Sequence, residues 1–124
     1  MAKAVFQAVL DAALNNIRDN ANLMHVLSAE PTTWTEFNST FKLADVAMIN
    51  TDFTLAAGDV SGRKVTSGAK TGVTIDANGT ATHVAWGDST NTLIKVVTTC
   101  TSQALNTGGT VDIPAWKYEI NQPT

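Results

Sequence analysis

"GVTIDANGTATHVAWGDSTNTLIKVVTTC", residues 72–100, is the stretch of sequence that decides the fold. Two of its runs, 73–75 and 80–86, are rich in the β-branched and aromatic residues that favour strands. Between them stands Asn78-Gly79, and an Asn-Gly pair flanked by such runs is the strongest short-range signal for a β-hairpin. We therefore predict that these two runs are paired strands.

Turn-forming residues continue this pattern toward the C-terminus. "GDSTN", residues 87–91, leads into a third β-rich run at 92–100, and "NTGGT" leads from there into "VDIPAWKYEI", residues 111–120. The residues of this last segment alternate between two faces, as in a half-solvated antiparallel strand, with Trp116, Tyr118 and Ile120 on one face and Lys117 and Glu119 on the other. The C-terminal half therefore predicts a β-meander closed by a final strand.

The N-terminal part of the chain begins with a different period. Apolar residues recur at helical spacing and predict an amphipathic helix over about 3–19, with a stripe made of Phe6, Val9, Leu10, Ala13, Leu14 and Ile17. The segment "LMHVL", residues 23–27, is typical of a buried strand. Thr33 followed by Glu36 predicts a capping box for one short helical turn.

The middle of the chain is punctuated by glycines, which predict short strands at 53–55 and 63–67. "FKLADVAMI", residues 41–49, fits a strand or a helix equally well. The expected fold class is α+β and β-dominant: an N-terminal amphipathic helix, then an antiparallel β-sheet or small β-sandwich with a C-terminal β-meander. We expect residues 1–124 to form one domain, strand-rich over 22–121, because a chain of this length suits a single core.

The composition excludes several classes of function. Charged residues make up only 15% of the chain, against about 25% in ordinary soluble domains. The formal net charge is -3, and no cluster of Lys or Arg is present to hold a phosphate backbone, so we expect no nucleic-acid partner. Gln7, Asp11 and Asn15 interrupt the N-terminal apolar run, which predicts neither a signal peptide nor a membrane span.

Residues 82–100 bring a histidine, an acid, a serine and the single cysteine close together in sequence. A catalytic triad would need His83 within hydrogen-bond reach of Ser89 or Cys100, with a third group such as Asp88 to orient it. Asp and Ser in a Gly-Asp-Ser turn are what turn chemistry selects in any case. We therefore predict a turn and a partly exposed strand histidine, no catalytic residues, and a Cys100 that is buried or contacts a neighbouring subunit.

No cofactor or metal site is expected. His25, His83 and Cys100 lack the paired close spacing of zinc ligands, and no phosphate-binding glycine motif is present. His25 lies between Met24 and Val26 and is expected to be a hydrogen-bonded sheet residue.

A weakly charged surface is typical of proteins that pack against other subunits, because charges there would have to be desolvated. Tryptophan is favoured in interface cores, although the three tryptophans of this chain suit a small β core equally well. We expect the N-terminal helix or the edges of the Trp-containing strands to make the contacts. The candidate interface residues are Phe6, Leu10, Trp34, Trp86, Trp116 and Cys100.

Four segments carry a resemblance that runs over nearly the whole chain: "EPTTWTEF", "GDVSGRKVTSGAKTGVTIDANGTATHVAW", "LIKVVTTCTSQAL" and "TVDIPAWKYEI". Together they resemble a group of small tailed-bacteriophage proteins with an N-terminal helix, a "QPTTYTEA"-like segment, a "GRKVT" strand, a "GTATHVAL" strand, a "VTTCTSQALTSGNTV" stretch and a terminal "IPAWDIEI". This chain departs from that pattern at Trp86-Gly87, where the group continues with Leu-Val, and at "KYEI", where acidic variants are usual.

The resemblance implies a structural component of a virion, made in the host bacterial cytoplasm and carrying no catalytic residues. A capsid decoration (cement) protein would fit, with the major capsid protein or other virion subunits as partners and a homo-oligomer as the expected state. A tail, neck or fibre-associated subunit fits the same observations. Two alternatives from other classes are a β-sandwich module that binds host glycan through exposed Trp and Asn side chains, and a small hydrolase that uses His83.

Overall fold

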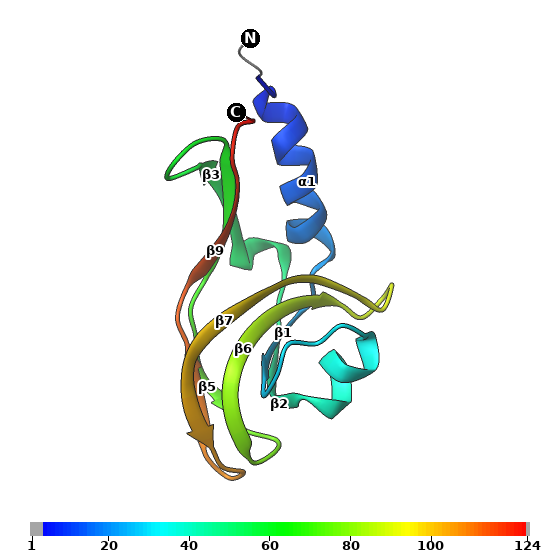
Figure 1. The fold of residues 1–124 in the computed structure, drawn as a ribbon, viewed down its shortest axis with the longest axis vertical. Coiled ribbons are helices and arrows are strands. Elements are labelled where there is room, and N and C mark those ends of the chain that lie inside the picture. The colour runs from blue at the N-terminus through cyan, green and yellow to red at the C-terminus, as the bar shows by residue number, and fades with distance from the viewer. Residues whose placement is uncertain (1–3, 124) are drawn as a thin grey trace.

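The computed structural model describes residues 4–123 and has one helix at one end of a strand-rich body (Figure 1). Helix α1 spans Gln7–Asn20, and short helical turns occupy Glu36–Thr40 and Asn50–Asp52. The strands of the described residues are β1 (Leu23–Leu27), β2 (Lys42–Ala47), β3 (Phe53–Ala57), β4 (Arg63–Ser67), β5 (Lys70–Thr74), β6 (Gly79–Asp88), β7 (Leu93–Leu105), β8 (Thr110–Ile113) and β9 (Trp116–Ile120).

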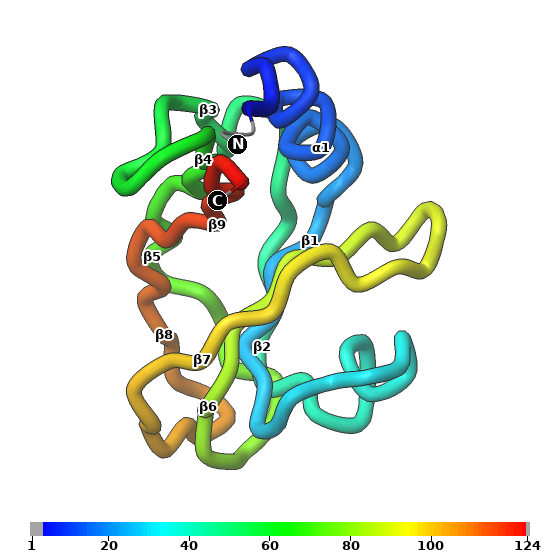
Figure 2. Tube along the Cα trace, turned by 45° about the horizontal axis from the view of Figure 1, so that its top comes forward, coloured from blue at the N-terminus to red at the C-terminus, as the bar shows by residue number. Residues whose placement is uncertain are grey.

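These strands form three antiparallel sheets, which confirms the predicted β-dominant α+β class. The largest sheet has the order β2-β1-β6-β7, the second has the order β3-β4-β9, and β5 pairs with β8 alone. Figure 2 shows the long strands β6 and β7 curving through the half of the molecule that lies away from α1.

Helix α1 packs on the β3-β4-β9 sheet through its buried residues Leu10, Leu14 and Ile17. At its start, Asp11 accepts a hydrogen bond from Nε of Arg63 on β4 at 2.7 Å, and the same two groups form an ion pair. The predicted helix begins too early, however, because Phe6 has an extended backbone and the first helical residue is Gln7. Residue 3, where the helix was expected to start, lies outside the described residues.

The reason for this late start is a contact with the other end of the chain. The backbone N–H of Val5 donates to Oε1 of Gln122, and Nε2 of Gln122 donates to the carbonyl oxygen of Val5, both at 2.8 Å. The Gln122 amide thus satisfies both backbone groups of Val5 and holds the segment that precedes the extended residue Phe6. We call this pair of hydrogen bonds the Val5–Gln122 clasp.

Several local predictions from the first half of the chain are confirmed. The segment 23–27 is a strand whose last four residues are buried, since β1 lies between β2 and β6. Phe53–Ala57 and Arg63–Ser67 are strands, and the undecided segment 41–49 contains the strand Lys42–Ala47.

The capping box is only half formed. Thr33 Oγ1 accepts the backbone N–H of Glu36 at 3.2 Å, as predicted. The Glu36 carboxylate, however, accepts its short hydrogen bonds from the backbone N–H and the hydroxyl of Thr32, at 2.9 Å and 2.8 Å.

The predicted hairpin at Asn78-Gly79 is wrong. Strand β5 pairs with β8, while β6 pairs with β1 and β7. Between β5 and β6 the chain crosses to β2, where Ile75 bridges Ala44, and Oδ1 of Asn78 accepts the backbone N–H of Thr107 at 2.7 Å. Gly79 does not form a turn. Its missing side chain lets the Leu43 side chain pack closely against the backbone, because a Cβ added at Gly79 would lie 2.8 Å from Cδ2 of Leu43.

The predicted C-terminal meander is reduced to one hairpin. Strands β6 and β7 pair as expected across the turn after Asp88. Strand β8, however, pairs with β5, and β9 pairs with β4 in a separate sheet. Turn signals thus located the ends of these strands but not their partners.

Candidate interaction surface

The four polar residues singled out in residues 82–100 do not form a catalytic arrangement. Nδ1 of His83 lies 2.8 Å from the hydroxyl of its neighbour Thr82. Ser89 pairs instead with Asn22, which accepts its backbone N–H at 3.0 Å and donates to its hydroxyl at 2.9 Å. The side chains of His83 and Ser89 therefore hydrogen-bond to other residues and not to each other.

Asp88 is a buried anchor of the β6–β7 turn. Its carboxylate accepts the backbone N–H of Thr90 at 2.9 Å and that of Asn91 at 3.2 Å, and also the side-chain amide of Asn91 at 2.8 Å. The hydrogen bond from the Asn91 side chain is the main cause of a lowered pKa of Asp88, against the opposing effect of desolvation. The carboxylate is therefore held ionised and saturated with donors, which is the structural role that turn chemistry predicts.

His25 is fully buried in the centre of the β2-β1-β6-β7 sheet. Its ring stacks on Phe37 at a centroid distance of 4.0 Å, and Nδ1 lies 3.0 Å from the carbonyl oxygen of Phe37. Because a carbonyl oxygen can only accept, Nδ1 carries the proton, and Nε2 is left buried without a partner. Burial lowers the pKa of His25, so the ring is a neutral, hydrogen-bonded core residue, as the sequence predicted.

A pair of carboxylates that the sequence could not single out meets at the start of the crossing between β5 and β6. The side chain of Asp76 hydrogen-bonds to that of Asp45, and this contact raises the pKa of Asp76. Lys42 lies 3.5 Å from the Asp45 carboxylate and offsets part of the negative charge. Within residues 4–123, no group of three or more His, Cys, Asp or Glu residues is arranged to hold a metal ion.

Two of the candidate interface residues face the core. Trp86 is fully buried, and Leu10 is 6% exposed on the face of α1 that packs on the sheet. Trp86 stacks on Trp116 at 3.8 Å and meets the edge of Phe53 at 5.2 Å. Their expected role at an interface is therefore corrected to a role in the core, because no part of Trp86 is accessible to a partner.

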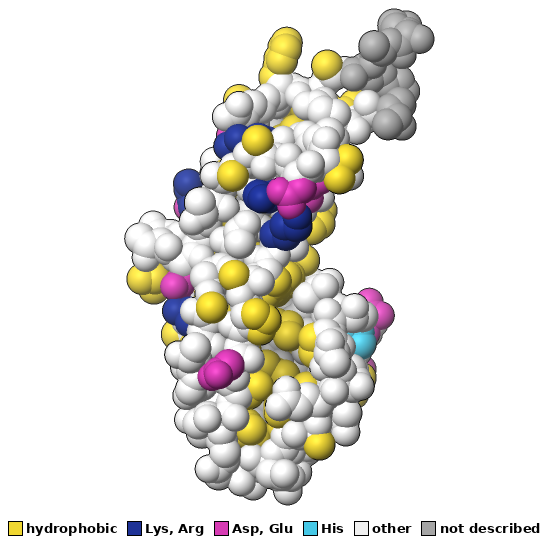
Figure 3. All heavy atoms as spheres, turned by 90° about the vertical axis from the view of Figure 1, so that its left-hand side faces the viewer, with side chains coloured by type: hydrophobic (Ala, Val, Ile, Leu, Met, Phe, Trp, Pro, Cys, Tyr) yellow, Lys and Arg dark blue, Asp and Glu magenta, His cyan; other side chains and the backbone are white. Residues whose placement is uncertain are grey.

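Cys100 and Trp116 lie at the rim of an apolar groove. The groove runs between β7 and the segment from β8 to β9, and has adjoining pockets of about 210 Å³ and 340 Å³. Val84, Cys100 and Ile113 line both pockets, and Trp116 lines the larger one. Figure 3 shows apolar side chains gathered in a hollow on this side of the molecule.

The groove exists because the strands do not close into a complete ring. Pairing runs from β8 through β5, reaches β2 by the bridge between Ile75 and Ala44, and continues through β1 and β6 to β7. Among the described residues no pairing joins β7 to β8, although only residues 106–109 separate them in the chain. The open position leaves two unpaired strand edges on either side of an apolar floor.

Cys100 is half-buried in this groove and has no disulfide partner within the chain. Burial raises the pKa of its thiol. The thiol therefore stays protonated at neutral pH and behaves as a small apolar side chain. Its accessible part points to the groove that β7 shares with β8 and β9, since Cys100 lines both pockets.

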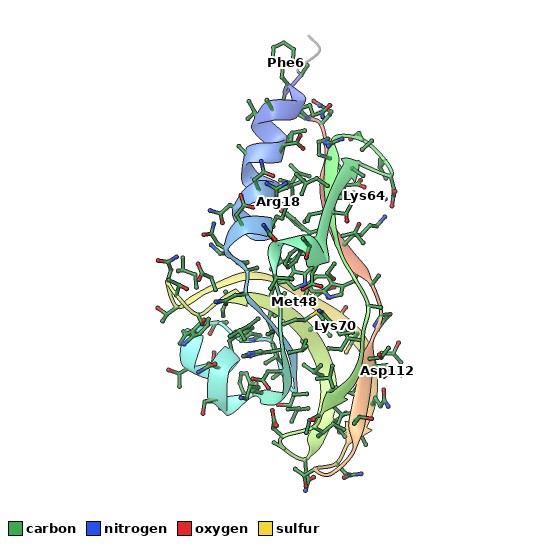
Figure 4. All side chains as sticks on the ribbon, turned by 180° about the vertical axis from the view of Figure 1, so that it is seen from behind. Phe6, Arg18, Met48, Lys64, Lys70 and Asp112 are labelled. Carbon is green, nitrogen blue, oxygen red and sulfur yellow. The ribbon has the colours of Figure 1, made fainter. Side chains whose placement is uncertain are left out.

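Phe6 is the most exposed of the candidate interface residues. Its side chain is 83% exposed at the N-terminal end of α1, and Val9, one helical turn later, is 63% exposed. Figure 4 shows Phe6 projecting from the end of the molecule, away from the rest of the body. The Val5–Gln122 clasp fixes the backbone immediately before it, so this exposure belongs to an anchored segment. We call Phe6 and Val9 the apolar knob.

Trp34 is half-buried and belongs to a second small core under the excursion between β1 and β2. Its ring lies 5.0 Å from that of Phe37, which is fully buried. With Trp86 buried and Trp116 half-buried, none of the three tryptophans is a fully exposed platform. Sugar rings bound by stacking would therefore have to use the partly covered faces of Trp34 or Trp116.

No protein-family model and no curated protein matches this sequence, and no solved structure matches the fold. In the described residues no helix combines the length and the apolar character that crossing a membrane requires.

Proposed function

We propose that this chain is a structural component of a tailed-bacteriophage virion, and that it decorates the capsid by binding between shell subunits. The observation that carries the proposal is the exposure of large apolar side chains on a weakly charged surface, namely Phe6 and Val60 at 83%, Ile49 at 64%, Val9 at 63% and Leu93 at 51%. Side chains of this size are costly to leave in water and are typical of surfaces that become buried on assembly.

Two of the side chains that had suggested chemistry are engaged in the turn between β6 and β7. Asp88 accepts a hydrogen bond from the backbone of Thr90, and the Ser89 hydroxyl accepts one from Asn22. The resemblance of the sequence to small phage proteins supplies the class of assembly. In a virion shell, many subunit contacts of modest area act together. Each contact can therefore be weak while the assembled shell is stable.

The test is to purify particles from a host that carries this gene and to measure the copy number of the chain against the major capsid protein. We expect about as many copies as symmetric positions on the shell, and density on the capsid surface in a reconstruction of the whole particle. Copies found only at the neck, tail or fibre would replace decoration by a tail-associated role. Absence from the particles would reject the virion proposal.

A host-glycan-binding module is the second candidate, because Trp34 and Trp116 each keep part of their surface accessible. It predicts that a saccharide changes tryptophan fluorescence in the isolated protein. A Trp34→Phe variant should lose that change if Trp34 is the platform, whereas the virion proposal predicts no saccharide response in either protein.

A further inference from the structure

We propose that copies of this chain associate head to tail, with the apolar knob of one copy inserted into the groove between β7 and β8–β9 of the next. This inference deepens the proposed function by naming the surfaces through which neighbouring copies meet. It rests on three matched properties of the knob and the groove: chemical character, size and position.

The two surfaces are alike in character. The groove floor is made of Val84, Val111 and Ile113, with Cys100 at its side. Its charged lining residue, Asp112, is already engaged, because its carboxylate accepts the backbone N–H of Gly72 at 2.8 Å. No acidic residue lies beside the knob in the first turn of α1. Insertion would therefore bring apolar side chains of the knob against apolar side chains of the groove and remove both from water.

The two surfaces also match in size. A cavity of about 150 Å³ accommodates a benzene ring, and the smaller pocket of the groove measures about 210 Å³. The adjoining pocket of about 340 Å³ leaves room for a second side chain, such as Val9.

Their positions require two molecules. Figure 4 labels Phe6 at one end of the molecule and Asp112, at the groove, in the opposite half. The Val5–Gln122 clasp prevents the segment before Phe6 from folding back toward its own groove. Every copy thus presents one knob and one groove that its own chain cannot join. A contact of this kind is heterologous, so it extends into a ring or an array instead of stopping at a dimer.

The area indicates how strong one contact can be. A buried Phe contributes roughly 150–250 Å², which is well below the roughly 800 Å² per partner of a stable interface. One knob in one groove therefore binds weakly, and stable association requires many copies held side by side. A covalent trap is the appropriate measurement, because it accumulates a weak contact.

Cys100 supplies the trap, since it lies in the groove and is the single cysteine of the chain. We would mix the wild-type protein with a mass-tagged Val9→Cys/Cys100→Ser variant, which keeps Phe6, under mild oxidation at about pH 8.5, near the usual thiol pKa. The disulfide between position 9 and Cys100 should form the main dimer of unequal chains. The matched control is Val60→Cys/Cys100→Ser, because Val60 is also an exposed valine but lies on another element. We expect about tenfold less product from the control.

A second substitution tests the groove itself. Thr101 lines the groove and is exposed, so Thr101→Trp in the protein that carries Cys100 should fill the groove without disturbing the core. The yield of the 9–100 disulfide should then fall to that of the Val60 control. Equal yields from the Val9 and Val60 variants, or a yield unaffected by Thr101→Trp, would overturn the head-to-tail contact.

These outcomes are separable from those of the virion experiment. Equal cross-linking of the two cysteine variants, with many copies present on particles, would reject the knob-in-groove contact and keep the virion role. Specific cross-linking with no copies on particles would keep the contact and reject that role.

Discussion

Trp86 and Trp116 stack with ring centroids 3.8 Å apart and an angle of 19° between their planes. Trp86 belongs to β6 in the largest sheet, whereas Trp116 opens β9 in the three-stranded sheet. Phe53, on β3, meets Trp86 edge-on and adds a third ring. The stack therefore joins two sheets that share no hydrogen-bonded strand pair.

Truncation of Trp86 should be among the most damaging single changes in the chain. Trp86→Ala would remove a fully buried indole and leave Trp116 and Phe53 without their common partner. We expect the free energy of unfolding to fall by about 3–5 kcal/mol. Chemical denaturation followed by far-UV circular dichroism measures it, and Val60→Ala, at an 83% exposed position, should change it by less than about 0.5 kcal/mol. A loss of less than 1 kcal/mol for Trp86→Ala would contradict the stacked arrangement.

A side chain at Gly87 should destabilise the protein by clashing with the ring of Phe37, and a smaller residue at position 37 should relieve the clash. A Cβ added at Gly87 would lie 2.4 Å from Cζ of the buried Phe37 ring. Gly87→Ala should therefore destabilise the protein by about 1–3 kcal/mol. In a Phe37→Leu background the same change should cost less, because the clashing ring atoms are gone. The test is a double-mutant cycle, and additive effects of the two substitutions would show that they do not touch.

Asp88 should couple stability to acid pH. Its pKa is lowered in the folded protein by the Asn91 side chain, so the unfolded chain binds a proton more readily. The stabilisation is thus fully present above the ordinary Asp pKa of 3.8 and is lost as pH falls below it through the lower folded pKa. Asp88→Asn should reduce the melting temperature at pH 7 and flatten its fall in acid. Asp19→Asn, at an exposed position, is the comparison variant.

His25 should couple stability to pH in a higher window. Burial lowers its pKa in the folded protein, whereas the unfolded chain protonates near 6.5. Stability is therefore present above about pH 6.5 and declines as pH falls toward the folded pKa, by at most about 1.4 kcal/mol per pH unit. His25→Asn retains a donor for the Phe37 carbonyl and cannot titrate. Its unfolding free energy should lack this slope, and an unchanged slope between about pH 6.5 and 5 would exclude His25 as the source.

Strand positions were readable from the sequence because they depend on nearby residues. An apolar run located β1 to its residues, and runs rich in β-branched residues located β4 and most of β6. Strand pairing depends on residues that are distant in the sequence, and the predicted pairing of β5 with β6 was wrong. Asn78-Gly79 has the composition of a hairpin turn, but the Asn78 amide bonds to Thr107, and Gly79 makes room for Leu43.

The exposed start of α1 and the groove were even harder to predict from the sequence. The predicted helical stripe correctly included Leu10, Leu14 and Ile17, which are buried. Periodicity could not show that Phe6 lies outside the helix, or that Phe6 and Val9 are exposed. The groove depends on a missing pairing between β7 and β8, which no local pattern encodes. Cys100 stood at the end of a β-rich run in the sequence, and only the fold shows which space it borders.

The Val5–Gln122 clasp joins residues 117 positions apart. Its two hydrogen bonds can form only when the segment after β9 lies beside the start of α1. The backbone immediately before the apolar knob is therefore held by the folded chain and not by its local sequence. Local unfolding that detaches Gln122 from Val5 would free this backbone while leaving the sheet pairing intact.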